Sequence, residues 1–531
     1  MTSATKRLIS GRRLSPLRLL LLLIVLAGLT VGGFFGGTTL IGGIEISQAA
    51  VYKPWFAPYV DVTATPTFAF QDLGSTPHKD AVLAFIVSDP THACVPSWGG
   101  AYTLNQAGYA LNLDSRIARL QQQGGSVAVS FGGASNNELA VGCANPQKLL
   151  SAYRSVVERY NLNTIDLDLE NRALTDVAAG GRRAAAIAKL QSERRAAGKK
   201  LAVWVTLPGS PQGLTRDGFH AVAQLLKHGV DLAGVNIMTM DYGSSLSPGQ
   251  TMLTASESAI THTEHQIKSL YQQAGVHLHN TTLWSKTGIT PMIGQNNNRN
   301  EVFTLRDAKR LNKFALSHGV GRMSMWSVNR DIMCGSNYVN DQVVSDSCSG
   351  VKQAQYAFSD TLGKGFEGNL FLSAGYSAAL AAANRQKPDS PATSPYQIWS
   401  ATGTYVAGER VVWQHYIYIA KWWTEGNVPN NPVLQSWQTP WTLIGPVLPG
   451  EHPISQPTLP KGTYPAWSGT AVYQAGQRVI FQEVPYQAKW WNQGNSPAAG
   501  FSNPTGSPWV PLNQAQINAI VSNLQQTRAV K

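Results

Sequence analysis

Eight short apolar runs alternate with helix-like runs between residues 51 and 386, and this alternation most constrains the fold. The helix-like runs repeat apolar residues about every 3.6 positions, whereas the apolar runs between them are short and rich in strand-forming residues. Eight strand–helix units over about 330 residues are typical of a (β/α)8 barrel, an α/β fold in which helices surround a ring of parallel strands. The expected strands are 57–62, 82–88, 126–131, 164–169, 201–207, 232–238, 289–293 and 322–327. The expected helices include 114–123, 146–160, 182–197, 217–228, 256–274 and 305–318.

The fourth expected strand carries three acids, Asp166, Asp168 and Glu170, in alternation with aliphatic residues. Successive strand residues point to opposite faces, so the three acids share one face and lie about 6.6 Å apart. Carboxylates this close repel one another, so at least one tends to keep a proton near neutral pH. Cleavage of a glycosidic bond requires a protonated acid beside an ionised one. The alternative is an edge strand with a solvated acidic face, although such faces usually mix charge signs.

The first 50 residues are expected to direct export. Basic residues extend to Arg18, and residues 19–44 carry no charge. This uncharged run is long enough to span a bilayer, and a small-x-small cleavage site follows at Ser47–Ala49. A cleaved signal peptide and a retained membrane anchor therefore both remain open. The basic flank places the N-terminus in the cytoplasm and the rest of the chain in the extracellular space.

The charge pattern argues against nucleic acid as a partner. The net charge is +12, but five of the positive charges lie in the export segment and no dense basic stripe follows. No C-x-x-C pair occurs and the histidines are scattered, so neither a metal site nor a cofactor is expected. We expect a monomer.

Four cysteines occur, and an exported protein meets an oxidising compartment in which they pair. Three connectivities are possible. The barrel interpretation favours Cys94–Cys143 and Cys334–Cys348, because Cys94 and Cys143 follow the second and third strands on the same rim.

An internal repeat with a constant offset of 68 residues occupies the C-terminal part, where ten of the fifteen tryptophans lie. It predicts two small all-β modules, 396–445 and 464–512. Pro-rich spacers, 387–395 and 446–463, precede and separate them, and 513–531 is expected to be a short polar helical tail. A module of about 50 residues is near the lower size limit for a stable hydrophobic core that has no disulfide or metal cross-links, so several of the tryptophans must be buried in that core.

Each copy contains Ala-Lys-Trp-Trp, ending at Trp423 and Trp491. Neighbours on a strand face opposite sides, so one ring per copy is expected to be exposed and to stack on pyranose rings. The alternative is that both rings pack internally. The candidate sugar contacts are Tyr418, Trp422, Trp423, Tyr486, Trp490 and Trp491.

The repeat resembles the chitin-binding modules of carbohydrate-binding families 5 and 12. Both copies match the signature Tyr…Gly-x-x-Val…Tyr-x-Ala-Lys-Trp-Trp…Gly-x-x-Pro…Pro-Trp, with Trp413 in the first copy replaced by Phe481 in the second. The resemblance implies chitin as the partner.

The large domain resembles the family 18 glycoside hydrolases, a chitinase family with a (β/α)8 barrel. Ser130-Phe-Gly-Gly133 matches the family's Ser-x-Gly-Gly, and the three acids match most of Asp-x-x-Asp-x-Asp-x-Glu. The first Asp of that motif is Asn163 here, a change that can alter how the inner acids share protons.

The resemblance implies a retaining, substrate-assisted mechanism in which the substrate's acetamide oxygen is the nucleophile. Glu170 would protonate the leaving oxygen and later activate water, Asp168 would orient the acetamide, and Asp166 would set the proton balance of Asp168. Two alternatives remain: an inactive chitin-binding lectin, and an endo-β-N-acetylglucosaminidase.

Further candidate substrate contacts come from the family's Met-x-Tyr-Asp motif on the sixth strand and from the strand ends. Met240 stands where the family Tyr is expected, and Tyr242 follows Asp241. A buried core tyrosine is the alternative for Tyr242. The candidates are Met238, Asp241, Tyr242, Asp61, Gln295 and Trp326, with Asp331 a weaker one.

Overall fold

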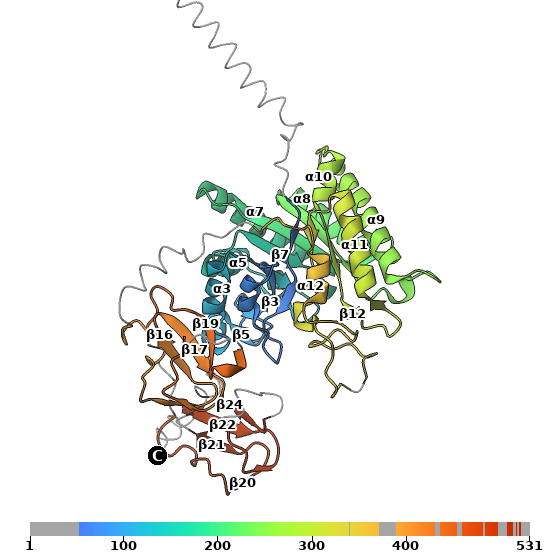
Figure 1. The fold of residues 1–531 in the computed structure, drawn as a ribbon. Helices are drawn as coiled ribbons and strands as arrows, with labels where there is room; N and C mark the ends of the chain where they lie inside the picture. The colour runs from blue at the N-terminus through green and yellow to red at the C-terminus, as the bar shows by residue number, and fades with distance from the viewer. Residues whose placement is uncertain are drawn as a thin grey trace, which may run out of the picture.

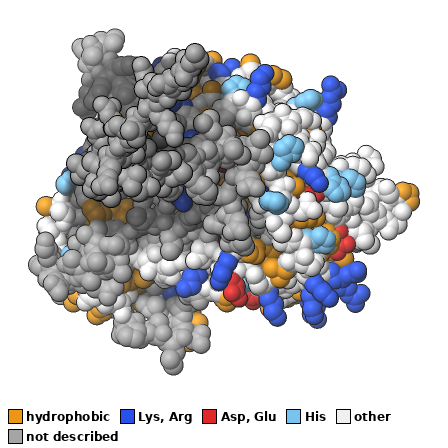
Figure 2. All heavy atoms as spheres, turned by 90° about the horizontal axis from the view of Figure 1, so that it is seen from above, with side chains coloured by type: hydrophobic (Ala, Val, Ile, Leu, Met, Phe, Trp, Pro, Cys, Tyr) orange, Lys and Arg blue, Asp and Glu red, His pale blue; other side chains and the backbone are white. Residues whose placement is uncertain are grey.

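The computed structural model describes residues 53–338, 340–370, 389–430, 436–453, 459–481, 484–497 and 507–512, together with 517, 520 and 521. The expected export segment and most of the expected tail lie outside these residues. No helix in the described part of the chain is long and apolar enough to cross a bilayer. The face in Figure 2 carries Lys and Arg side chains in several separate groups among other side chains.

The (β/α)8 barrel is confirmed (Figure 1). Its parallel ring runs through β1–β2, β3, β6, β7, β8, β10, β11 and β14, and closes where β1 pairs with β14. The strand bounds are β1 Trp55–Phe56, β2 Tyr59–Asp61, β3 Ala81–Ser88, β6 Val127–Gly132, β7 Thr164–Asp168, β8 Ala202–Ser210, β10 Leu232–Thr239, β11 Thr287–Pro291 and β14 Arg322–Met323. The first strand is split in two, and the seventh begins two residues earlier than expected.

Helices cover the outside of the ring, and all six expected helices are present. The bounds are α3 Leu113–Gln122, α5 Pro146–Arg159, α7 Val177–Ala196, α8 Arg216–Lys227, α9 Met252–Gln273 and α11 Leu305–His318. Helix α11 shows why they begin and end there: Thr304 and Asp307 form a capping box, and Gly319 ends the helix in the left-handed conformation. Shorter elements on the barrel are α2 Leu104–Ala110, α4 Leu139–Gly142, α6 Asn171–Thr175, α10 Asn280–Ser285, α12 Ala357–Leu362, β4 Pro96–Trp98, β5 Tyr102–Thr103, β9 Gly213–Leu214, β12 Gly294–Gln295 and β13 Val302–Phe303.

The side chains of β7 alternate between the two faces of the strand, as the sequence predicted. Ile165, Leu167 and Leu169 are fully buried in the outer core between strands and helices. Each contributes about 1.5–3 kcal/mol by leaving water, which fixes the register of the strand. The acids at the intervening positions therefore point into the barrel interior.

The two C-terminal modules have the same all-β topology. Each has a three-stranded antiparallel sheet and a two-stranded pair. In the first module these are β16 Arg410–Trp413, β17 Tyr416–Ala420 and β19 Trp441–Pro446, with β15 Thr404–Tyr405 and β18 Thr424–Glu425. In the second they are β21 Arg478–Phe481, β22 Val484–Ala488 and β24 Trp509–Pro511, with β20 Val472–Tyr473 and β23 Asn492–Gln493.

Tyr418 and Tyr486 form part of the module cores, where they are 6% and 2% exposed. The prediction that these rings contact sugar is therefore not supported. Each packs with a tryptophan near the end of its module, Trp441 or Trp509.

The prediction of one exposed tryptophan per copy is wrong, because both are exposed. Trp422 and Trp423 are 44% and 60% exposed, and Trp490 and Trp491 are 45% and 57% exposed. Strand β17 ends at Ala420 and β22 at Ala488, so the side-chain alternation of a strand does not extend to these residues.

The first module packs against the barrel through β19 and α3 (Figure 1). Arg119 of α3 donates to the carbonyl of Leu443, and the Tyr396 hydroxyl donates to Asn112 Oδ1 at 3.1 Å. Gly445 lies so close to the backbone of Ser115 that an added Cβ would overlap the Ser115 carbonyl oxygen. These contacts fix one edge of the first module on the barrel.

Candidate active site

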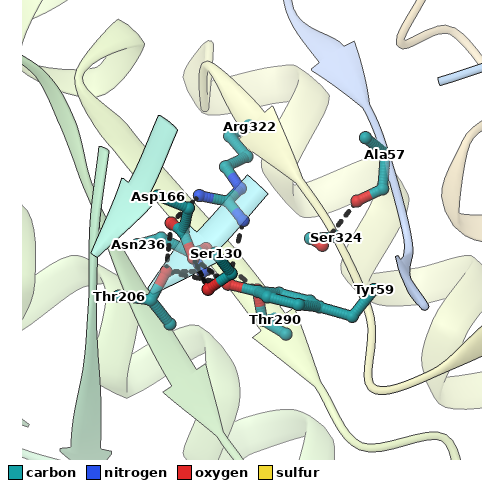
Figure 3. A network of polar contacts seen from close by, with 9 residues as sticks. All are labelled: Ala57, Tyr59, Ser130, Asp166, Thr206, Asn236, Thr290, Arg322 and Ser324. Carbon is teal, nitrogen blue, oxygen red and sulfur yellow. Dashed lines mark hydrogen bonds and ion pairs between the residues drawn. The ribbon is translucent and has the colours of Figure 1, made fainter. Parts of the chain in front are cut away.

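A polar network fills the middle of the barrel, and Asp166 is its centre (Figure 3). Its Oδ2 accepts from the Tyr59 hydroxyl at 2.8 Å and from Ser130 Oγ at 2.7 Å. Its Oδ1 accepts from Thr206 Oγ1 and from Arg322 Nη1, both at 2.7 Å. The four donors come from β2, β6, β8 and β14, so Asp166 joins opposite sides of the ring.

Arg322 is fully buried beneath this network. Its guanidinium lies 5.2, 5.4 and 5.6 Å from the ring centres of Trp55, Tyr59 and Trp204. Trp55 and Trp204 meet edge to face at 5.5 Å and belong to an apolar cluster inside the barrel. This packing fills the lower end of the barrel, and the C-terminal ends of the strands, at the other end, are called the barrel mouth below.

Asp168 lies one inward position above Asp166 and is 3% exposed. No described residue hydrogen-bonds to its Oδ1. Desolvation raises the pKa of Asp168 well above its ordinary value, and repulsion by Glu170 and Asp166 adds to the rise, while Arg322 opposes it. The result is a buried carboxyl with an unpaired oxygen.

Glu170 follows β7 and is partly exposed at the barrel mouth. It occupies the residue before α6 with an extended backbone, but its side chain does not cap the helix. Desolvation raises the pKa of Glu170, and the charge of Asp241 raises it further. With the pKa of both Asp168 and Glu170 raised, the pair can hold a shared proton near neutral pH.

Two consecutive glycines allow β6 to approach these acids. Gly132 has φ +114°, and a Cβ there would overlap the carbonyl oxygen of Asp168. Gly133 has φ +84°, and a Cβ there would lie 2.9 Å from the Phe85 ring. The Ser-x-Gly-Gly run is therefore required by close packing.

Aromatic rings line the mouth beside the acids. Trp326 stacks on Phe85 with ring centres 5.5 Å apart and planes 18° apart, and both rings are partly exposed. Met238 lies on β10 two residues beyond Asn236, whose side-chain amide donates a hydrogen bond inside the barrel. Alternate residues of a strand face the same side, so Met238 also points inward, and it is partly exposed. Trp326 and Met238 thus both lie at the barrel mouth.

Comparisons with known proteins find relatives and solved structures named as chitinases. The chain is 35% identical over 326 residues to a probable bifunctional chitinase/lysozyme of Escherichia coli (58% of this chain, 34% of that protein). It is 35% identical over 293 residues to Endochitinase 11 of Metarhizium anisopliae (53% of this chain, 54% of that protein). Over these lengths the chain is therefore similar to proteins named as chitinases. It spans about a third and about half of the lengths of these two relatives.

Among solved structures, the chain is similar to the catalytic domain of a hyperthermophilic chitinase from Pyrococcus furiosus. The two share 27% identity with a TM-score of 0.51, over 61% of this chain and 97% of that one. Residues 466–510 match carbohydrate-binding module family 5/12. The first module shares the 68-residue repeat with this segment.

Tyr242 does not lie in the barrel mouth. It is 5% exposed and belongs to the outer core. Asp241 has φ +50°, which turns the chain there, and the Tyr242 N–H donates to Glu301 Oε2 at 2.8 Å. The Asp241 carboxylate accepts from the backbone and side-chain amides of Asn297, at 2.8 and 2.7 Å. Substrate contact by Tyr242 is therefore not supported, whereas Asp241 is close enough to Glu170 to raise its pKa.

Three other side chains that are expected to contact substrate form hydrogen bonds within loops instead. Gln295 is buried, and its Nε2 lies within hydrogen-bonding distance of several backbone carbonyls, including that of Asn296 at 3.0 Å. Asp61 accepts from the N–H and hydroxyl of Thr63 at 2.8 and 2.7 Å. Asp331 accepts from the first turn of α12, including the N–H of Ser359 at 2.8 Å. Since these bonds are internal, the structure gives no support for substrate contact by these side chains.

Asn163 immediately precedes β7, at a position whose side chain faces the opposite side of the strand from the three acids. Its Oδ1 accepts from Arg194 Nη2 of α7 at 3.0 Å, which places the side chain on the helix side of the ring. The replacement of the family's Asp at this position is therefore remote from the interior, and the expected effect on the inner acids is not supported.

Both expected disulfides are present, Cys94–Cys143 and Cys334–Cys348. Cys94 follows β3, and Cys143 follows α4 after β6, so the first bond joins two loops of one rim, as predicted. Within the described residues no group of His, Cys, Asp and Glu is placed to hold a metal.

Proposed function

We propose that the protein is an exported chitinase that hydrolyses β-1,4-N-acetylglucosamine linkages with retention, by substrate assistance as in family 18. The observation that carries this is the unpaired oxygen of Asp168, which lies between ion-paired Asp166 and Glu170 at the mouth. A hydrolase that used the Asp168 carboxylate as its nucleophile would need it accessible, whereas it is 3% exposed.

Each acid has one role in this reaction. Glu170 donates its proton to the glycosidic oxygen while the acetamide oxygen of the substrate attacks the anomeric carbon. The Asp168 Oδ1 accepts the acetamide N–H and stabilises the positive charge that develops. Glu170, now ionised, removes a proton from water, which opens the cyclic intermediate and restores the acid. Trp326 lies beneath the reacting sugar.

The barrel comprises residues 51–386, and the modules comprise residues 396–445 and 464–512. The exposed tryptophan pairs of the two modules bind the polymer, and tethering raises its concentration at the barrel without new catalytic contacts. Residues 1–50 export the protein as a cleaved signal or a membrane anchor, and two disulfides suit an extracellular monomer.

The test is Glu170→Gln, with hydrolysis of a soluble chitin oligomer as the readout. Loss of the proton donor should lower kcat by at least about a hundredfold, while binding to chitin beads is unchanged. Glu193→Gln, on the outer surface of α7, is the matched control and should hydrolyse like the parent. NMR should show the β-anomer as the first product. Unchanged turnover in Glu170→Gln would exclude this acid, and an inactive parent that still binds beads would identify a lectin.

A further inference from the structure

We propose that Arg322 is a positioning residue that neutralises Asp166 in a buried ion pair and so confines the catalytic proton to Asp168 and Glu170. The inference rests on the proposed function, since it concerns the same acids. It differs from a scheme in which all three acids of the strand exchange protons.

The hydrogen bonds of Asp166 leave it no capacity for a fifth partner. A carboxylate offers about four acceptor positions, and Tyr59, Ser130, Thr206 and Arg322 fill two on each oxygen. All four donors are buried, so none can be replaced readily by water. Asp166 is therefore unable to accept a hydrogen bond from protonated Asp168.

The guanidinium is itself held rigidly. Besides Asp166, Arg322 Nη2 donates to the Tyr59 hydroxyl at 3.0 Å, and three aromatic rings surround the planar group. Figure 3 shows Arg322 reaching across the barrel from β14 to the acid on β7. The two opposite charges form a fixed, neutral pair beneath Asp168.

The charged or titratable groups that face Asp168 and Glu170 are then few. They are the Arg322–Asp166 pair, Tyr59 on β2, and Asp241 after β10, whose charge acts on Glu170. Removing Arg322 leaves Asp166 uncompensated, which raises the pKa of Asp168. Removing the charge of Asp166 leaves Arg322 uncompensated, which lowers it.

The two single variants should therefore move the pH profile in opposite directions. In Arg322→Met, both midpoints of the kcat/KM profile on a chitin oligomer should rise by on the order of one pH unit. In Asp166→Asn, they should fall by a similar amount. The double variant removes both charges and should return the midpoints toward those of the parent, even where turnover stays low.

Arg183→Met is the matched control, because Arg183 is also fully buried and ion-paired, with Glu138, but lies on α7 outside the barrel interior. It should leave both midpoints in place. A merely structural role for Arg322 would lower turnover or stability without moving the midpoints, and that result in folded Arg322→Met would overturn the proposal. If Arg322→Met does not fold, unmoved midpoints in Asp166→Asn would overturn it equally. An inactive parent would instead refute the proposed function.

Discussion

Replacing Gly445 by alanine tests whether the first module is fixed on the barrel. Gly445 lies on β19 beside α3, and its backbone conformation is one that other residues adopt, so only space requires glycine here. A Cβ would overlap the carbonyl oxygen of Ser115. Because that oxygen belongs to helix backbone, β19 must move away by on the order of 1 Å.

The cost follows from the bonds that this movement breaks. The Arg119–Leu443 bond has a charged donor and contributes about 1.5–3 kcal/mol, and the neutral Tyr396–Asn112 bond contributes about 0.5–1.5 kcal/mol. Arg119 keeps Asp72 at 2.8 Å, so its charge remains paired. The contact should therefore weaken by about 2–4.5 kcal/mol, a factor of about 30 to 2,000 in its equilibrium constant.

Hydrogen exchange measures this directly. In Gly445→Ala, amides of α3 and β19 should exchange faster, while those of β7 exchange as in the parent. Gly335→Ala is the matched control, because a Cβ at Gly335 meets no atom within 4 Å. Parent-like exchange across α3 and β19 in Gly445→Ala would refute the contact.

Two more outcomes are expected. Trp423→Ala and Trp491→Ala should each weaken retention on chitin beads by about tenfold, because a tryptophan buried against a ligand contributes at least about 1 kcal/mol. The double variant should weaken retention by more than either single variant. Unchanged retention in the double variant would refute the exposed pairs as binding sites. Burial raises the pKa of Glu451 to about 7. A hydrogen bond from the Leu448 N–H opposes this rise, and repulsion from Asp114 adds to it. Its folded pKa is thus above the unfolded value, so stability is full below about pH 4.5 and falls as the pH rises through 7. Glu451→Gln should therefore unfold at a higher temperature than the parent at pH 8 and gain less at pH 5, and an equal gain at both would contradict this.

The barrel could be predicted because its signals are local. Leu167 between two acids identifies both the strand and its buried face, and no distant residue is needed for that inference. The seventh strand was placed two residues late because Thr287 and Gly288 are not apolar, yet they pair with the sixth strand. Strand ends depend on such pairing, which a single segment does not reveal.

The site could be predicted only where it is part of one strand. Arg322 was missed because its partner Asp166 is 156 residues away, and the only signal was a charge at an inward position of an apolar run. Phe85 was missed because the pairing of β3 with β6 shifts register between Leu83 and Ile86. Simple alternation along the strand therefore does not predict which way the Phe85 side chain points. Tyr242 was misplaced for a related reason, since the turn at Asp241 decides where it points.

Arg322 connects the stability of the barrel with its proposed chemistry. Asp166 and Asp168 on buried β7, with Glu170 directly after it, would leave uncompensated charge in a medium of low polarity, at a cost of several kcal/mol per buried ion. One arginine removes that cost for one acid, and four hydrogen bonds hold the resulting carboxylate. Desolvation raises the pKa of both remaining acids, and repulsion adds to the rise, which favours a proton shared between them. A single shared proton is what the proposed acid–base cycle of Glu170 requires, so the arginine that compensates Asp166 also favours the proton distribution that this chemistry needs.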